Sequence, residues 1–365
     1  MSVLKINIVL FGKGNVGKEF LNQVIENQKT FLEKRNIDIQ FPIIANSRLA
    51  YFEKEGVDKF WESNFALAAI PYKLEDILDY VKIHNLENLV AIDLTDSEEL
   101  VKNYIPLIQN GFNIVAANKN ANTSSIEFYK EVRRNLDRHG KTFLYETNVG
   151  SGFPVVQTLR DLYSSGEQIT KIRGVFSDSF GNVFKRFSTE ESLFLSVLSE
   201  AGITGSKKSD SIENLYKNDV AKKTLILARE IGANLEFSDV NILPLFSSEL
   251  KEFNPKQEYE FDKKMLESYG ISKIADEDNH ILRYVGEFSV LENKLEVQLV
   301  SELQSFPIAR LDGSEKNFEI YTKSYGKIPI VIQGSGSGKE VLARGVLTDV
   351  FKVAEKLRIR EKVLV

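Results

Sequence analysis

Short apolar runs alternate with stretches of helical periodicity along the first 150 residues of the chain. The runs contain many β-branched residues and few polar ones, which is typical of strands buried on both faces of a parallel sheet. The predicted strands are residues 6–11, 37–45, 88–94, 112–117 and 142–145, with the longest predicted helix over about 16–34. This alternation predicts an α/β domain built on a Rossmann-type, doubly wound parallel sheet.

The pattern changes after about residue 154. A helix is predicted over 156–163, a strand over 169–177, and further helices over 190–200 and 218–229. Residues 280–288 and 294–300 alternate apolar with polar positions, which predicts antiparallel strands. A last apolar run, 328–332, precedes a Gly/Ser-rich stretch and an amphipathic helix over about 340–357. We therefore expect one domain of residues 1–150, completed by 333–365, and a second, α+β domain of residues 151–332.

Composition fits a soluble globular protein and excludes several functional classes. Of 365 residues, 42% are hydrophobic and 27% are charged. The chain has no cysteine, and its three histidines, His84, His139 and His280, lack ligand-like spacing, so neither thiolate chemistry nor a protein-built zinc site is expected. A net charge of −5 without a basic block argues against nucleic acid. No apolar run approaches membrane-spanning length and no signal-peptide pattern is found, so we expect a cytoplasmic protein.

A glycine-rich turn, Gly12-Lys13-Gly14-Asn15-Val16-Gly17, joins the first predicted strand to the first predicted helix. The first glycine permits the tight turn, the second lets the backbone approach a pyrophosphate, and the third allows close helix–strand packing. The helix N-terminus offers free N–H groups to the anion. Strand, turn and helix in this order favour a dinucleotide site over an ordinary glycine turn.

The same residues also fit the frame of a phosphate-binding P-loop, because Gly12 to Lys18 spell G-x-x-x-x-G-K. A P-loop needs Ser or Thr next, to place a hydroxyl on Mg²⁺, and Glu19 stands there instead. The stretch 333–340 fails similarly, with Gln333 in place of the first glycine. A nucleoside triphosphate is therefore not the predicted ligand.

The end of the second predicted strand bears on the choice of coenzyme. An NAD site usually carries Asp or Glu there to hold the ribose 2′-hydroxyl. This chain has Asn46-Ser47-Arg48, in which the guanidinium of Arg48 is able to bind a 2′-phosphate. The alternative is that Arg48 is only a solvated loop charge. We expect NADP, with NAD as the second possibility.

Two further predicted strands end in polar residues, at the edge where a doubly wound sheet binds its ligands. Thr95, Asp96 and Ser97 follow one of them and are expected to face the cofactor, although Ser97 could equally cap the next helix. Lys119 follows the next strand, where it could neutralise phosphate, polarise a carbonyl, or be a surface charge. A loop over 146–154, with two glycines and a proline, could present carbonyl groups to a cation or substrate, or could simply connect the domains.

Asp219 and Lys223 stand four residues apart in a predicted helix and so share one of its faces. The lysine could exchange a proton with a substrate oxygen while the acid holds a substrate ammonium. From spacing alone, an exposed ion pair worth about 0.2–0.5 kcal/mol is the simpler interpretation.

Together these segments resemble homoserine dehydrogenase, particularly the dehydrogenase half of the bifunctional aspartokinase–homoserine dehydrogenases, without the kinase portion. The segments that carry the resemblance are GKGNVG, IIANSR, DLTDS, AANKNANTSS, FLYETNVGSGFPVV, KNDVAKKTLILARE, ILRYVG and IPIVIQGSGSGKEVLARGVLTDVF. The resemblance implies interconversion of L-aspartate 4-semialdehyde and L-homoserine with NAD(P)H, in threonine and methionine biosynthesis. It also implies a homodimer or higher homo-oligomer, with the second domain serving substrate binding, catalysis and dimerisation.

The resemblance implies roles for individual residues of the coenzyme site. Thr95 would lie against the nicotinamide, and Lys119 would lie between cofactor and substrate. The pyrophosphate would be lined by Gly12, Gly14, Asn15, Val16 and Gly17. Apart from the resemblance, we expect the Gly334 to Gly338 stretch, with Gly336 at its centre, to contact the cofactor, and Gly202 is a further candidate contact. The backbone of Glu146, Val149, Ser151 and Phe153 matches the sodium-binding loop of the family.

On the substrate side, the resemblance makes Asp219 a substrate-binding residue and Lys223 the general acid/base that protonates the aldehyde oxygen as the hydride arrives. This reverses the simpler interpretation of the pair.

Two segments depart from the family pattern. The family has Gly-Tyr-x-Glu-Pro-Asp-Pro, with a glutamate for the substrate amine, where residues 201–210 here place Gly205 or Lys208, depending on the alignment. The family's Ser-Gly-Thr-x-x-Tyr-Ile-like substrate loop reads Ser177 to Val183, SDSFGNV, here. Asp178 could supply the missing negative charge. The alternatives are therefore a dehydrogenase of another small aldehyde or hydroxy acid, and a silent homologue that binds dinucleotide as a partner subunit, for example of a separate aspartokinase.

Overall fold

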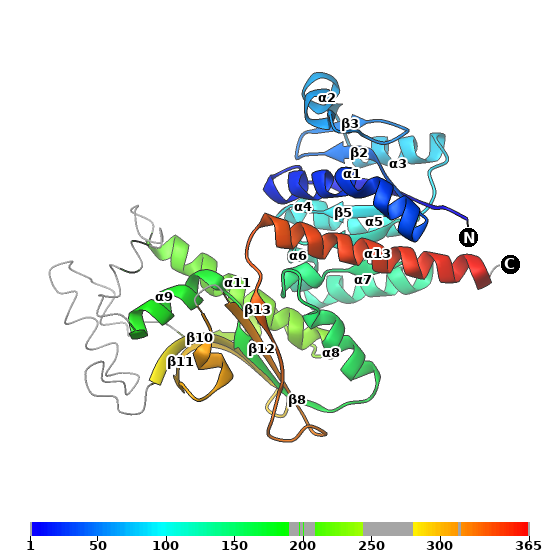
Figure 1. Cartoon of the computed structure of the whole chain (residues 1–365). Helices are drawn as coiled ribbons and strands as arrows, with labels where there is room; N and C mark the ends of the chain where they lie inside the picture. Colours follow the sequence, from blue (N-terminus) through cyan, green and yellow to red (C-terminus); the bar gives the residue numbers. More distant parts are fainter. Residues whose placement is uncertain are drawn as a thin grey trace. The chain divides into compact units, whose positions relative to one another are not determined.

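The computed structural model describes residues 2–189, 197, 200, 209–243, 280–312 and 315–363 (Figure 1). Its contacts divide the chain into two compact units. Unit 1 comprises Met1–Phe153 and Gly338–Val365, and unit 2 comprises Pro154–Ser337. Most of the predicted helix over 190–200, and Gly202, Gly205 and Lys208, lie outside the described residues.

Unit 1 alternates strands and helices. Its elements are β1 (Leu4–Phe11), α1 (Asn15–Arg35), β2 (Ile37–Ala45), β3 (Leu49–Phe52), α2 (Trp61–Ala68), β4 (Ile70–Pro71), α3 (Leu74–Ile83), β5 (Leu89–Asp93), α4 (Glu98–Lys102), α5 (Tyr104–Gln109), β6 (Asn113–Ala116), α6 (Asn120–Thr123), α7 (Ile126–His139), β7 (Phe143–Leu144), the 3₁₀ turn η1 (Glu146–Asn148) and α13 (Lys339–Val363).

The unit 1 sheet has the strand order β4-β3-β2-β1-β5-β6-β7. β1 pairs in parallel with both β2 and β5, so the chain winds outward from β1 in both directions. The strand order therefore reverses beside β1, and in such sheets ligands bind at the carboxyl ends of the strands at this point. β3 and β4 form an antiparallel edge.

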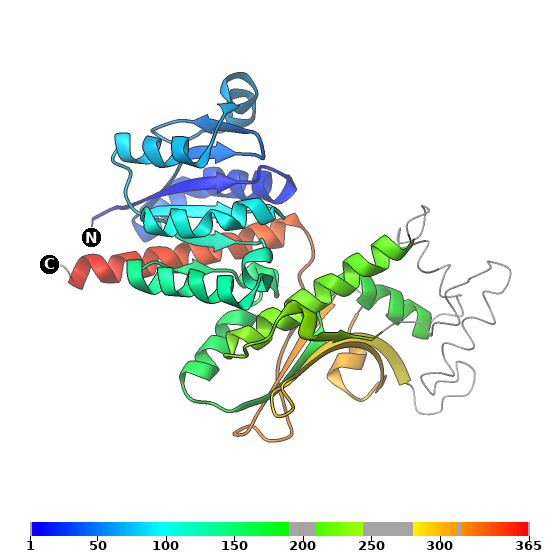
Figure 2. The ribbon, with the colours of Figure 1, turned by 180° about the vertical axis from the view of Figure 1, so that it is seen from behind.

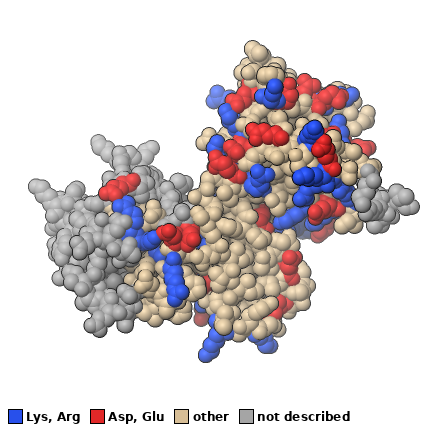
Figure 3. All heavy atoms as spheres, viewed as in Figure 1, with Lys and Arg blue, Asp and Glu red and all other residues tan. Residues whose placement is uncertain are grey.

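Helices cover both faces of this sheet. α1 and α13 lie side by side on one face (Figure 1), and α3, α5 and α7 lie on the other (Figure 2). α13 comes from the far end of the chain, yet Ala343, Val346, Leu347 and Val350 are fully buried in the core that also contains β1 and α1. Charged side chains of both signs are intermixed over the face of unit 1 seen in Figure 3.

Unit 2 combines one sheet with several helices. Its described elements are α8 (Val155–Ser164), β8 (Ile169–Val175), α9 (Asp178–Thr189), α11 (Ser209–Glu230), η2 (Phe237–Asp239), β9 (Val240–Ile242), β10 (His280–Ser289), β11 (Lys294–Leu303), η5 (Pro307–Arg310), β12 (Glu315–Thr322) and β13 (Ile330–Ser335). The sheet order is β13-β12-β8-β10-β11-β9. β10 and β11 pair antiparallel along their whole length, as their alternating pattern predicts. The predicted fold class, a Rossmann-type parallel sheet with a second α+β part, is confirmed.

The segment 178–182, expected as a substrate loop, is instead the first turn of α9. The amide of Gly181 donates to the carbonyl of Ser177 at 2.9 Å. Val183, Phe184 and Phe187 are buried along this helix, and their spacing fits one helical face. The helical spacing of these buried positions therefore determines the structure here, although residues Ser177 to Asn182 are of types common in loops.

A buried arginine fixes part of unit 2. Arg283 on β10 is 1% exposed, and its guanidinium donates to the carbonyls of Ile308 at 3.0 Å and of Ala309 at 2.7 Å. Burial lowers the pKa of Arg283 to about 10. These bonds satisfy carbonyl groups of η5 that have no partner within so short a turn, and they hold the turn on the sheet.

Among the described residues, no helix is long and apolar enough to cross a membrane. The described part of the chain also contains no group of three or more His, Cys, Asp or Glu side chains arranged to hold a metal ion.

Candidate functional site

Each glycine of the turn after β1 has a different steric environment. Gly12 has φ +99°, and a Cβ there would lie 2.7 Å from the carbonyl oxygen of Leu94. A Cβ on Gly17 would lie 1.9 Å from the carbonyl oxygen of Gly12. A Cβ on Gly14 would meet nothing within 4 Å. The outer glycines therefore allow close packing of the backbone, whereas Gly14 borders open space.

The N-terminus of α1 begins at this open position. Gly14 is the N-cap residue, no side chain caps the helix, and its first turn, which contains Asn15 and Val16, has no acid. The carboxylate of Glu19 lies 3.1 Å from the ammonium of Lys339 on α13. A hydrogen bond from Gln23 is the main cause that lowers the pKa of Glu19, with Lys339 adding to it. Uncapped N–H groups and the helix dipole favour an anion here.

Arg48 lies in the turn between β2 and β3. The side-chain oxygen of Asn46 accepts hydrogen bonds from the amides of Arg48 at 2.8 Å and Leu49 at 2.7 Å, which fixes the backbone of this turn. The Arg48 side chain is exposed and has no ion-pair partner within the described ranges. Its guanidinium is therefore available to a ligand at the end of β2.

A buried carboxylate organises the ends of β5 and β6. Asp93 accepts hydrogen bonds from the backbone amide of Thr95 at 2.8 Å and from its hydroxyl at 2.7 Å. The other carboxylate oxygen accepts from the hydroxyl of Tyr104 at 2.7 Å and from the side-chain amide of Asn118 at 2.9 Å. Thr95 and Asn118 are thus held by one side chain.

Lys119 follows Asn118 at the N-terminus of α6 and is half-buried. The side chain of Asn118 also donates to the carbonyl of Ser97 at 3.0 Å and accepts from the amide of Asn120 at 3.0 Å. Ser97 caps α4, with its hydroxyl accepting from the amide of Leu100 at 3.1 Å. The predicted helix cap at Ser97 is therefore present, and the turn that carries Thr95 continues directly into this cap.

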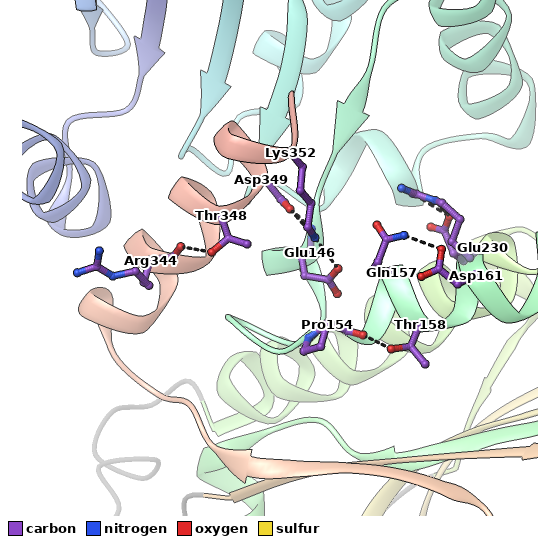
Figure 4. A network of polar contacts seen from close by, with 11 residues as sticks. Glu146, Pro154, Gln157, Thr158, Asp161, Glu230, Arg344, Thr348, Asp349 and Lys352 are labelled. Atoms are coloured by element: carbon purple, nitrogen blue, oxygen red, sulfur yellow. Dashed lines mark hydrogen bonds and ion pairs between the residues drawn. The ribbon is translucent and has the colours of Figure 1, made fainter. Parts of the chain in front are cut away.

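α13 contacts the loop that starts at Glu146, and Figure 4 shows Asp349 and Lys352 of this helix next to Glu146. A Cβ on Gly345 would lie 2.4 Å from the carbonyl oxygen of Ser151. Asp349 accepts from the backbone amide of Glu146 at 3.0 Å. The ammonium of Lys352 lies 3.3 Å from Asp349 and 3.7 Å from the Glu146 carboxylate. Helix α13 therefore sets the conformation of this loop.

The contacts of this loop do not support the sodium ion that the resemblance implied. The carboxylate of Glu146 already faces Lys352, and its carbonyl oxygen accepts from the amides of Val149 at 3.4 Å and Gly150 at 3.3 Å. Val149 and Ser151 are buried and Phe153 is half-buried. We therefore assign no step to sodium.

In unit 2, Asp219 and Lys223 form a close ion pair on α11. The ammonium of Lys223 lies 2.7 Å from the Asp219 carboxylate and 2.8 Å from the carbonyl oxygen of Phe176, just beyond the end of β8. The side chain of Lys223 is only 10% exposed, whereas that of Asp219 is 33% exposed. An exposed surface pair, the simpler interpretation from spacing, is therefore wrong.

A glycine on β10 permits this arrangement. A Cβ on Gly286 would lie 2.3 Å from the hydroxyl of Thr224, the residue after Lys223. Without that Cβ, α11 approaches the sheet closely enough for Lys223 to reach the Phe176 carbonyl.

Two further candidate positions lie in the described part of the chain. The backbone of Asp178 begins α9, and Gly336 is buried after β13.

Two family models match the chain. The model described as "Homoserine dehydrogenase" matches residues 154–351, and the one described as "Homoserine dehydrogenase, NAD binding domain" matches residues 12–146. The chain belongs to the homoserine dehydrogenase family. The resemblance seen in the sequence is thereby confirmed, and residues 12–146 form the family's NAD-binding domain.

Individual relatives of the homoserine dehydrogenase family show the same relationship. The bifunctional aspartokinase/homoserine dehydrogenase of Buchnera aphidicola is 35% identical over 95% of this chain and 42% of that protein. The chain thus spans less than half the length of that relative. The homoserine dehydrogenase of Saccharomyces cerevisiae is 29% identical over 98% of this chain and 100% of that protein. A hyperthermophilic archaeal homoserine dehydrogenase, solved in complex with NADPH, has the same fold, with a TM-score of 0.71 and 20% identity over 97% of this chain and 98% of that chain.

Three residues that organise the candidate site, Asp93, Asp349 and Lys352, were not predicted from the sequence. Asp93 lies in the predicted strand over 88–94 and was given no role of its own in the site. Its signal was available, because an acid that ends a fully buried strand needs internal hydrogen-bond donors. Asp349 and Lys352 gave no such signal, because their contacts with Glu146 join segments about 200 residues apart in the chain.

Proposed function

We propose that this chain interconverts L-aspartate 4-semialdehyde and L-homoserine with NADP(H), the step that supplies homoserine to threonine and methionine biosynthesis. The observation that carries the proposal is the buried pair of Lys223 and Asp219 on the segment where the homoserine dehydrogenase model matches. An ammonium held by both a carboxylate and a carbonyl is oriented to donate a proton.

Four features of unit 1 fit a bound NADP. The open N-terminus of α1 at Gly14 would hold the pyrophosphate, with Gly12 and Gly17 allowing the turn. Arg48 would bind the 2′-phosphate at the end of β2. Thr95 would lie against the nicotinamide, with Lys119 beside it. The coenzyme, when bound, supplies or accepts the hydride.

The chain's own residues would handle the proton and the substrate. In the reducing direction, Lys223 gives a proton to the aldehyde oxygen as that oxygen gains charge, and in the oxidising direction it takes the proton from the hydroxyl. The Asp219 carboxylate keeps the ammonium in place. Because its side chain is one-third exposed (33%), Asp219 would also attract the ammonium of the substrate.

The direct test is NADP-dependent oxidation of L-homoserine by the purified protein, followed by the absorbance of the NADPH formed. Tight NADPH binding without turnover of homoserine or any related hydroxy acid would contradict the proposal and favour a silent homologue. Turnover of a different hydroxy acid alone would keep the chemistry and replace the substrate.

Coenzyme choice depends on Arg48. Arg48→Ala is expected to weaken NADPH binding about 10- to 100-fold, because a charge-assisted phosphate contact worth about 1.5–3 kcal/mol is lost. NADH binding should stay within about twofold, since NADH has no 2′-phosphate. Fluorescence titration with both coenzymes measures the two affinities. Equal weakening for both would show that Arg48 shapes the turn and does not read the phosphate.

Asp178 is the candidate for the missing acid of the substrate site. Its backbone begins α9 two residues after Phe176, whose carbonyl binds Lys223. Asp178→Asn is expected to raise the KM for homoserine about 10-fold, the effect of losing about 1.4 kcal/mol of attraction to an ammonium. Ser179→Ala, one residue along, is the control. An unchanged KM in steady-state kinetics would remove Asp178 from the site.

A further inference from the structure

The carboxylate of Asp93 is fully enclosed by hydrogen-bond donors. The residue is 1% exposed, and no ion pair involves it within the described part of the chain. Each carboxylate oxygen accepts two hydrogen bonds. One oxygen accepts from the amide and the hydroxyl of Thr95, and the other oxygen accepts from the side chains of Tyr104 and Asn118. Carboxylate oxygens that accept from two donors each are saturated. Asp93 therefore has no remaining capacity to contact a substrate, and its influence must pass through the residues it holds.

Burial removes the Asp93 carboxylate from water, so the hydrogen bonds of this group must replace the lost hydration. Burial raises the pKa of the Asp93 carboxyl, and the hydrogen bonds from Thr95, Tyr104 and Asn118 oppose that rise. Desolvation of a carboxylate is tolerated when several donors replace the lost water. The buried carboxylate therefore depends on these donors for its stability.

On one side, Asp93 fixes the turn after β5. Thr95 is bound through both its amide and its hydroxyl, and the hydroxyl accepts in turn from the amide of Ser97 at 3.1 Å. A Cβ on Gly12 would lie 2.9 Å from the Thr95 methyl group, so Thr95 packs against the glycine turn. The position of Thr95 is thus fixed by its hydrogen bonds to Asp93 and by its packing against Gly12.

On the other side, Asp93 fixes the end of β6 through Asn118. That side chain also bonds the carbonyl of Ser97 at 3.0 Å and the amide of Asn120 at 3.0 Å. Lys119 lies between the two bonded residues, so its backbone is held on both sides. β5 and β6 are neighbouring parallel strands, and their carboxyl ends border the ligand edge of the sheet.

We propose that Asp93 is the positioning residue for the nicotinamide end of the coenzyme, setting Thr95 and the backbone of Lys119 in one fixed geometry. The proposal rests on the proposed function, which places Thr95 and Lys119 at the nicotinamide. It assigns Asp93 no contact with substrate or coenzyme. Misplacement of the ring, rather than loss of a reacting group, is the expected defect when Asp93 is changed.

Asp93→Asn tests the proposal with almost no change in shape. It replaces one acceptor oxygen by an NH₂ group, which must face either the two donors of Thr95 or those of Tyr104 and Asn118. We expect kcat/KM for NADP to fall about 10- to 100-fold, because small misplacements of reacting groups have effects of this size. The KM for homoserine should change by less than about twofold, since Asp219, Lys223 and Asp178, the proposed substrate contacts, lie on α11 and α9 in unit 2.

Tyr104→Phe is the matched control. It removes one buried hydrogen bond to the same carboxylate but leaves the bonds to Thr95 and Asn118 in place. Thermal unfolding should show lower stability for both variants, whereas only Asp93→Asn should lose coenzyme efficiency. The double variant Asp93→Asn with Asn118→Asp exchanges acceptor and donor, and is expected to recover part of the lost kcat/KM for NADP. If Asp93→Asn fails to fold, Asn118→Ala is the second variant. It breaks the link between Asp93 and the end of β6, together with the Asn118 bonds to Ser97 and Asn120, and should still lower kcat/KM for NADP.

The outcomes separate this inference from the proposed function. Wild-type coenzyme kinetics in Asp93→Asn, in a protein that oxidises homoserine, would overturn the inference and leave the function standing. If the wild-type protein does not oxidise homoserine, fluorescence titration of NADPH still applies. An unchanged dissociation constant in Asp93→Asn would then overturn the inference, and a clear rise would support it.

Discussion

Lys223→Met is expected to lose about 10²- to 10⁴-fold in kcat for homoserine oxidation, the usual contribution of a positioned general acid or base. Methionine keeps the length and the apolar stem of the side chain, so it fills the space between α11 and the end of β8. Only the ammonium that contacts Asp219 and the Phe176 carbonyl is removed. NADPH affinity should stay near the wild-type value, because the coenzyme features lie in unit 1.

Lys222→Met is the control on the same helix. Lys222 is the preceding residue and is half-buried, so the substitution makes the same change of charge while Asp219 and Lys223 both keep their side chains. Stopped-flow or steady-state kinetics with saturating NADP separate kcat from coenzyme binding. If Lys223→Met kept more than about a tenth of the wild-type kcat, proton transfer by this ammonium would be ruled out.

Gly17→Ala is expected to lower the free energy of unfolding by about 3 kcal/mol. Its added methyl group would lie 1.9 Å from the carbonyl oxygen of Gly12. Because that oxygen belongs to the backbone, no side-chain rotation can relieve the clash. The turn after β1 and the start of α1 must then move apart. Urea-induced unfolding, monitored by circular dichroism, measures the loss.

Gly14→Ala, in the same turn, distinguishes packing from ligand binding. Nothing lies within 4 Å of the position its methyl group would take, so stability should change by less than about 1 kcal/mol. Coenzyme affinity should nevertheless fall, because the methyl group enters the space that the pyrophosphate needs. Wild-type NADPH affinity in Gly14→Ala would contradict the proposed place of the pyrophosphate.

The parallel strands of unit 1 could be predicted well because each is buried on both faces and so reads as an unbroken apolar run. The second strand was predicted over 37–45, the range that β2 occupies. Edge strands give no such run: β3 and β4 lie in a stretch of mixed polarity and were not recognised. β12 was not predicted because Glu319 interrupts its apolar positions. In the structure Glu319 is buried, where it forms an ion pair with Arg173 at 3.1 Å. Such pairing cannot be read from one segment alone.

The candidate site shows the same division between local and distant contacts. The glycine turn was predictable because all its requirements lie within six consecutive residues. The burial of Lys223 was not, since it depends on Phe176 and on Gly286. Residues Asp178 to Asn182 were misjudged as a loop because their own composition gave less information than the buried positions that follow them.

The position of α13 in the chain has a consequence for biosynthesis. The ribosome makes the five parallel strands of unit 1 first, then all of unit 2, and only then the helix that covers one face of the first sheet. Until α13 emerges, the apolar surface that will meet Ala343, Val346 and Leu347 faces water. The nascent protein is therefore expected to depend on chaperones until α13 has been made, and a stop codon before residue 339 should yield aggregated rather than merely shortened product.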